Sequence, residues 1–108
     1  ALLLTRVISK PGKDLICFDL GHKAVASEMP HPRVRLLGLE DNIEFVGHSE
    51  EHLVARTERA SELAVGDEFL GIPSHICPTV ALHNKVVAVE NEEPTGTWSV
   101  AARDLILD

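Results

Sequence analysis

Leu2-Leu3-Leu4-Thr5-Arg6-Val7-Ile8 and Leu15-Ile16-Cys17-Phe18-Asp19-Leu20 open the sequence as two apolar runs, and Pro11-Gly12-Lys13 separates them. A proline and glycine pair between two runs of strand-forming residues is typical of a hairpin turn. Both runs are far shorter than the ~20 residues that a membrane-spanning helix needs. The sequence therefore predicts a β-hairpin at its start.

Similar strand patterns recur along the chain, with turn residues between them at intervals of about 8 to 12 residues. The further predicted strands are residues 34–39, 43–46, 53–56, 68–72, 85–89 and 97–102. Helical patterns are limited to single turns at residues 60–63 and 79–84. We expect an all-β fold, a small barrel or sandwich of about eight to nine short strands with one or two short helical turns.

The composition limits the kind of protein. With 108 residues, 44% of them hydrophobic, the chain can bury one modest core, so residues 1–108 are expected to form a single domain. A formal net charge of -7 disfavours nucleic acids and anionic membranes as partners. Cys17 and Cys77 are too few for a disulfide framework, which favours a reducing, cytoplasmic location. A single Cys17–Cys77 disulfide is the alternative.

The segment Pro73-Ser74-His75-Ile76-Cys77-Pro78-Thr79 carries the strongest chemical signal. Proline disfavours the α region for the residue before it, so Pro78 predicts an extended Cys77. In an extended chain the side chains of His75 and Cys77 leave from the same face. Imidazole and thiolate suit Zn²⁺, and two protein ligands leave coordination positions open for water or substrate. We therefore predict a metal site at His75 and Cys77.

Other interpretations of these polar residues stay open. His75 and Cys77 alone form a weak pattern, and a packed polar residue beside a small buried hydrophobe is the alternative. Glu50, Glu51 and His52 could orient a ligating imidazole, but a solvated turn between two strands is the simpler interpretation. His83 approaches the metal only if residues 79–84 coil back. His22, His31 and His48 fit exposed loops, and Cys17 fits packing.

Five motifs occur in order along the chain. They are Asp19-x-Gly21-x-Lys23-x-x-x-Ser27, Ser49-Glu50-Glu51-His52, Val65-Gly66-Asp67, Pro73-x-His75-x-Cys77-Pro78-Thr79-Val80 and Trp98-x-Val100-x-Ala102-Arg103. Over roughly residues 7–108 this series resembles the C-terminal β-domain of the D-serine dehydratase and D-threonine aldolase family, pyridoxal-phosphate enzymes with an alanine-racemase-like fold. Trp98 and Arg103 match the pattern, and a core-filling indole and an ion-paired guanidinium explain them without catalysis.

The resemblance implies that this chain is the smaller part of a two-domain enzyme. The missing TIM-type barrel, which needs ~250 residues, would make most of the contacts to pyridoxal phosphate and would carry the Schiff-base lysine. The chain opens at Ala1 in an apolar run, and its single methionine is Met29, so we expect a fragment that is inactive alone. Lys10, Lys13, Lys23 and Lys85 do not match the Schiff-base position. Family enzymes commonly form homodimers, although no apolar stripe in this sequence requires one.

The resemblance also implies a lyase that acts on β-hydroxy D-amino acids. Zn²⁺ or Mn²⁺ at His75 and Cys77 would polarise the substrate hydroxyl. His-x-Cys is associated with dehydratases, which give a keto acid and ammonia, and His-x-Asp with aldolases, which give glycine and an aldehyde. Cys77 therefore favours a dehydratase over the aldolase alternative. A non-catalytic β-barrel module that binds a partner, with His75 and Cys77 merely packed, is the remaining alternative.

Overall fold

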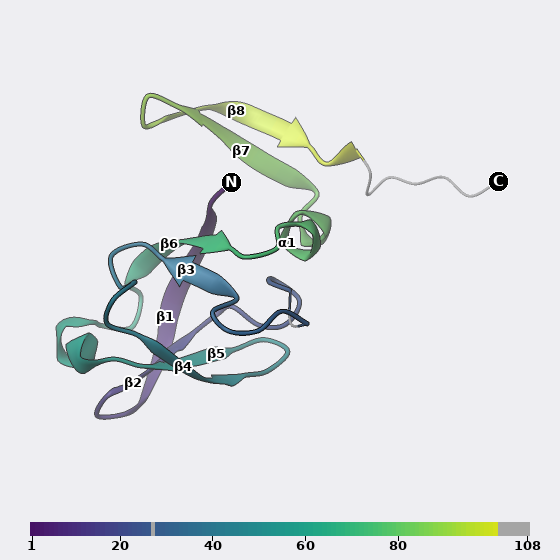
Figure 1. Cartoon of the computed structure of the whole chain (residues 1–108). Coiled ribbons are helices and arrows are strands. Elements are labelled where there is room, and N and C mark those ends of the chain that lie inside the picture. The colour runs from purple at the N-terminus through teal and green to yellow at the C-terminus, as the bar shows by residue number, and fades with distance from the viewer. Residues whose placement is uncertain (27, 102–108) are drawn as a thin grey trace.

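The computed structural model describes residues 1–26 and 28–101, and within them the fold is mostly β, as predicted (Figure 1). The strands are β1 (Leu3–Gly12), β2 (Leu15–Phe18), β3 (Val34–Leu36), β4 (Glu44–His48), β5 (Leu53–Arg56), β6 (Glu68–Pro73), β7 (Lys85–Glu90) and β8 (Glu93–Ser99). The two helical turns are a 3-10 helix, η1 (Glu58–Glu62), and one short α-helix, α1 (Cys77–Leu82). No helix in the described ranges has the length and apolar character needed to cross a bilayer.

Six strands form one antiparallel sheet in the order β3-β6-β1-β2-β5-β4. The sheet curls into an open half-barrel, with β3 and β4 as its two edge strands (Figure 1). Among the described residues, β7 and β8 pair only with each other and form a separate two-stranded hairpin. The chain therefore contains a half-barrel and a hairpin, joined through α1.

The predicted hairpin at the start is present, but its turn lies later than expected. β1 continues through Pro11 and Gly12, and residues 13–14 make the turn. Gly12 pairs with Leu15 across that turn. Pro11 lies close to the end of β1, where the sheet tolerates a residue without a backbone N–H. The proline and glycine pair thus correctly predicted a hairpin between these strands, but the turn lies two residues later than that pair.

One apolar core fills the concave side of the half-barrel. Its strand side chains come from the inward faces of β1, β2, β3 and β5, which follows the two-residue period of β-structure, and the other core side chains come from η1 and the connecting segments. β1 shows this clearly, because Thr5 and Val7 are buried while Leu4 and Arg6 are exposed. The core residues are Val7, Ile16, Phe18, Leu20, Val25, Val34, Leu36, Leu39, Leu53, Ala55, Ala60 and Leu63.

The last strand begins earlier than the sequence predicts. We expected it at residues 97–102, whereas β8 spans Glu93–Ser99, and residue 102 lies outside the described residues. Asn91 and Glu92 form the two-residue turn that reverses the chain, with φ values of 49° and 66°. Positive φ at both positions is the geometry of a type I′ turn, whose twist matches paired strands. The turn therefore allows pairing to start at once, with Glu90 opposite Glu93.

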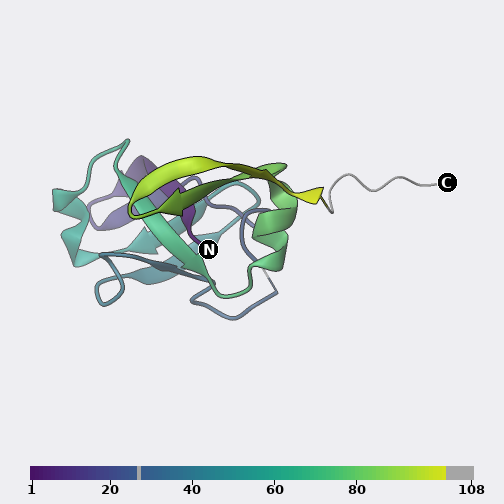
Figure 2. The ribbon, with the colours of Figure 1, turned by 90° about the horizontal axis from the view of Figure 1, so that it is seen from above.

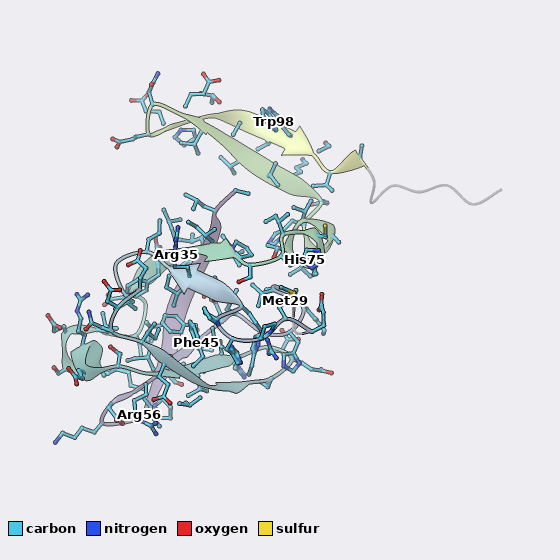
Figure 3. The ribbon with its side chains drawn as sticks, in the orientation of Figure 1. Met29, Arg35, Phe45, Arg56, His75 and Trp98 are labelled. Carbon is cyan, nitrogen blue, oxygen red and sulfur yellow. The ribbon has the colours of Figure 1, made fainter. Side chains whose placement is uncertain are left out.

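The β7–β8 hairpin is exposed on both faces. Trp98, paired with Val86, is 68% exposed on one face, and Val87 and Val89 are 62% and 60% exposed on the other. The expectation that Trp98 fills the core is therefore wrong; it lies on β8, away from the half-barrel (Figure 3).

Further exposed leucines lie beneath the hairpin. Figures 1 and 2 both place it over the start of β1 and over β6, where Leu2, Leu4 and Leu70 are exposed. The sequence analysis found no apolar stripe that requires a homodimer, and it did not foresee these exposed apolar side chains.

A close backbone contact ties the segment after β2 to the turn between β4 and β5. Gly21 is buried against the Glu50 backbone, and the His22 amide donates to the Ser49 carbonyl at 2.8 Å. A Cβ at residue 21 would lie only 1.9 Å from the Glu50 carbonyl oxygen. Glycine is therefore required here because two backbones approach closely.

Replacing Gly21 with alanine is expected to lower the free energy of unfolding by about 1 to 3 kcal/mol, as at other overpacked positions. Urea unfolding of the chain measures this change. Gly47→Ala is the matched control, because its new Cβ would meet Val54 at an ordinary 3.7 Å. Equal stabilities for the two variants would show that the contact between Gly21 and Glu50 is not as tight as described.

Candidate functional site

His75 lies in the link between β6 and α1, Cys77 lies at the start of α1, and both are exposed. The expected extended geometry is wrong: Ile76 has φ -77° and ψ -23°, and Cys77 is the first residue of α1. Pro78 does not prevent this, because proline is tolerated in the first turn of a helix, where the N–H has no intrahelical partner. Figure 3 shows His75 beside α1, above the segment that carries Met29.

Glu28 forms a hydrogen bond with one ring nitrogen of His75. Its Oε1 lies 3.3 Å from Nδ1 of His75, and both side chains are partly exposed. Because a carboxylate accepts hydrogen bonds, Nδ1 carries the hydrogen and Nε2 keeps its lone pair. A carboxylate that orients an imidazole in this way is usual around metal-ligating histidines. The sequence analysis missed Glu28 because 47 residues separate it from His75.

The carboxyl of Glu28 has a lowered pKa. The Glu28 backbone amide is the main cause, desolvation opposes it, and the hydrogen bond from His75 lowers the pKa further. The carboxylate is therefore the form that accepts from the imidazole near neutral pH.

Three further hydrogen bonds fasten the segment around His75 to the carbonyls of Ala24, Pro32 and Arg33. The Ser74 amide donates to the Arg33 carbonyl at 2.8 Å, and the Ser74 hydroxyl donates to the Pro32 carbonyl at 2.7 Å. On the other side of His75, the Thr79 hydroxyl donates to the Ala24 carbonyl. The start of α1 and the residue before His75 are therefore tied to Ala24 and to the stretch 28–33.

The donors on this chain fit part of a metal site. An imidazole nitrogen and an unpaired thiol are exposed two residues apart, and both suit Zn²⁺. In residues 1–26 and 28–101, no group of three or more His, Cys, Asp or Glu side chains is placed to hold a metal. Any cation at His75 and Cys77 would therefore need donors from outside this set.

The other predicted candidates lie in structural contacts. Glu50, Glu51 and His52 are exposed in the turn between β4 and β5, and Glu51 forms an ion pair with Lys23 at 3.0 Å. That ion pair raises the pKa of Lys23. His83 follows the last residue of α1, and its ring Nδ1 lies 2.9 Å from the Thr79 carbonyl within that helix.

The remaining sequence predictions have mixed outcomes. Cys17 is buried, as expected for packing, and both cysteines are free, so the alternative of a Cys17–Cys77 disulfide is not observed. Ser27, Ala102 and Arg103 of the motifs lie outside the described residues.

Three histidines that the sequence analysis assigned to exposed loops gather around β4. The ring of His48 lies 4.5 Å from that of His22 and 6.0 Å from that of His31, centroid to centroid. His31 also stacks on Phe45 at 5.7 Å. Burial is the main cause that lowers the pKa of His48, and burial likewise lowers the pKa of His31. No spacing rule brings positions 22, 31 and 48 together, so only the fold reveals this cluster.

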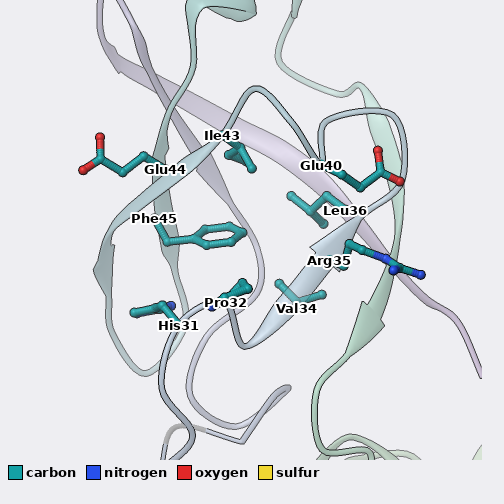
Figure 4. A pocket seen from close by; sticks show the side chains of 9 residues that line it. All are labelled: His31, Pro32, Val34, Arg35, Leu36, Glu40, Ile43, Glu44 and Phe45. Atoms are coloured by element: carbon teal, nitrogen blue, oxygen red, sulfur yellow. The ribbon is translucent and has the colours of Figure 1, made fainter.

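A pocket of about 380 Å³ lies between the two edge strands, β3 and β4 (Figure 4). Apolar side chains line its centre, while Glu40, Glu44 and Arg35 point away from it in Figure 4. The lining residues are His31, Pro32, Val34, Arg35, Leu36, Glu40, Ile43, Glu44 and Phe45. None of the residues that the sequence analysis proposed as ligands lines this pocket.

Comparison with known proteins points to one family. Residues 1–89 match the family model described as "Putative serine dehydratase domain". A D-threonine aldolase from Arthrobacter sp is 30% identical over 102 residues, which cover 94% of this chain and 26% of the aldolase. A 3-hydroxy-D-aspartate aldolase from Paracoccus denitrificans is 32% identical over 103 residues, 94% of this chain and 25% of that enzyme.

A solved structure supports the same relationship. The crystal structure of D-threonine aldolase from Filomicrobium marinum matches with a TM-score of 0.73 and 25% identity, and the match covers 94% of this chain and 28% of that one. The chain thus spans about a quarter of the length of the relatives that it matches.

Proposed function

Because the chain belongs to this serine dehydratase domain family, we propose that it is the metal-bearing β-domain of a pyridoxal-phosphate-dependent lyase for β-hydroxy D-amino acids. The proposed metal ligands are Nε2 of His75 and the thiolate of Cys77. The carrying observation is the hydrogen bond between Nδ1 of His75 and Glu28, which leaves the other ring nitrogen available.

The residues of this chain would hold and orient the metal. Glu28 fixes the tautomer of His75, while the contacts of Ser74 and Thr79 hold the backbone on either side of it. A bound Zn²⁺ or Mn²⁺ would supply a Lewis acid for the substrate hydroxyl, and pyridoxal phosphate an electron sink for charge at the substrate α-carbon. We also propose a reducing compartment such as the cytoplasm, because Cys77 must stay reduced to ligate a metal.

Dehydration is the first candidate reaction, and aldol cleavage is the second. Cys77 favours dehydration to a keto acid and ammonia, through the association of His-x-Cys with dehydratases. The relatives favour the second, because those named above are a D-threonine aldolase and a 3-hydroxy-D-aspartate aldolase. Both reactions use the same substrate class, so the product decides between them.

The rest of the proposed enzyme would lie outside these 108 residues. The relatives are about four times as long as the matched segment, which leaves room for a barrel domain with the Schiff-base lysine. An isolated two-stranded hairpin is at best marginally stable in water, so the apolar faces of β7 and β8 need a cover. We propose that the remaining, larger part of the full-length polypeptide covers these faces.

Metal affinity tests the site in the full-length protein that contains this chain. Competition with a zinc indicator should show that His75→Ala and Cys77→Ser each remove tight binding. Glu28→Ala should weaken it by about 10- to 100-fold, as for other carboxylates behind a ligating imidazole. Glu51→Ala is the matched control, since its carboxylate pairs with Lys23 instead. Zinc affinity that is unchanged in both ligand variants would refute the site.

Product analysis tests the reaction. The full-length protein with D-serine or D-threonine, pyridoxal phosphate and Zn²⁺ or Mn²⁺ should release a keto acid and ammonia, whereas glycine and an aldehyde would establish the aldolase. The 108-residue chain alone should release neither product. If the full-length protein also releases neither, the lyase proposal fails.

Trp98 reports whether the hairpin is covered. In the 108-residue chain its fluorescence should be that of an exposed indole and should be quenched readily by acrylamide, because the side chain is 68% exposed. In the full-length protein the fluorescence of Trp98 is the difference between wild type and Trp98→Phe. That difference signal should be shifted to the blue and protected from quenching by acrylamide. Equal quenching in both proteins would show that the larger part does not cover this hairpin.

A further inference from the structure

His48 occupies a hydrogen-bonded position that admits only a neutral ring. Its Nδ1 lies 2.8 Å from Nη1 of Arg33, and its Nε2 lies 2.9 Å from the carbonyl oxygen of Leu20. Arginine only donates, so Nδ1 must accept; a carbonyl only accepts, so Nε2 must carry the hydrogen. The geometry therefore fixes both the tautomer and the charge of His48.

Arg33 connects His48 to the candidate metal site. Its Nε donates to the Met29 carbonyl at 2.7 Å, which closes the turn that follows Glu28. Its own carbonyl accepts the Ser74 amide, next to His75 in sequence. Hydrogen bonds thus run from His48 of β4 through Arg33 to Ser74, which precedes His75, and to Met29, which follows Glu28.

We propose that His48 is a positioning residue for His75. In its neutral form His48 holds residues 28–33 in place, and on protonation it releases Arg33 and loosens that stretch. This inference rests on the proposed function, since a fixed His75 matters only if it binds a ligand. A second hydrogen on the ring would place two donors, Nδ1–H and the guanidinium, against each other. Like charges on His48 and Arg33 would add repulsion.

The groups around His48 set the direction of the pH dependence. Within the part of the chain that the structure describes, His22, His31 and Arg33 face its ring. Burial lowers the pKa of His48 most, the Leu20 carbonyl opposes this, and His22 and Arg33 lower it further.

The sign of the pH effect follows from this direction. The folded-state pKa lies below the unfolded value of about 6.5, so the stabilising contribution is present above that value. It is lost as the pH falls through the lower, folded-state pKa.

Amide hydrogen exchange in the metal-free chain tests the proposal, with protection factors corrected for the intrinsic pH dependence of exchange. As the pH falls from 7.5 to 5, protection of the Ser74 amide should drop about tenfold, the equivalent of one lost hydrogen bond. The Thr57 amide, bonded to Asp14, takes no part in this network and should keep its protection.

Three variants separate positioning from a general loss of structure. His48→Gln cannot titrate but can still accept from Arg33 and donate to Leu20, so Ser74 should stay protected at every pH. Arg33→Gln should leave Ser74 poorly protected at every pH and reduce the Nδ1–H tautomer of His75, seen in its ring ¹⁵N shifts. His52→Gln makes the same change at an exposed histidine and should behave as wild type.

Two results would overturn the proposal. One is a Ser74 amide whose protection stays constant while the ring signals of His48 report its protonation. The other is the same pH-dependent loss in His48→Gln as in wild type. Because this experiment contains no metal or substrate, either result leaves the proposed function standing. A failed zinc experiment would instead remove the role of His75 as a ligand and leave the pH-dependent loosening at Ser74 as a separate finding.

Discussion

The close approach of Gly21 to the backbone of Glu50 is the constraint on which the candidate site depends. It joins the segment after β2 to the turn between β4 and β5, and the hydrogen bond from His22 to Ser49 and the ion pair of Lys23 with Glu51 strengthen the junction. Ala24, close to this junction, and Pro32 and Arg33, further along the chain, carry the contacts to the start of α1. The fold thus positions His75 through a loop that is anchored at both ends.

Two of the sequence motifs acquire a physical meaning from this junction. Asp19-x-Gly21-x-Lys23 and Ser49-Glu50-Glu51-His52 are far apart in sequence but meet in the structure. Asp19 accepts from the Thr5 hydroxyl at 2.6 Å and from the Arg6 amide at 2.9 Å, so it fixes β1 against the end of β2. These residues therefore serve the architecture and hold the segment that leads to His75.

The sequence predicted the strands well, because the two-residue alternation of buried and exposed side chains is a local property. It failed where distant contacts or particular turns decide. Cys77 begins a helix despite Pro78, and two positive φ values at Asn91 and Glu92 start β8 early. Glu28 and His48 could not be found from spacing, because only the folded loop brings them into the network around His75.

The central claim, a cation held by His75 and Cys77, is tested most directly by absorption spectroscopy of the Co²⁺-substituted full-length protein. Sulfur ligation of Co²⁺ gives an intense thiolate-to-metal charge-transfer band, which the account predicts in wild type and in Cys17→Ala and which should vanish in Cys77→Ser. The absence of this band from wild type, or its persistence in Cys77→Ser, would contradict the account.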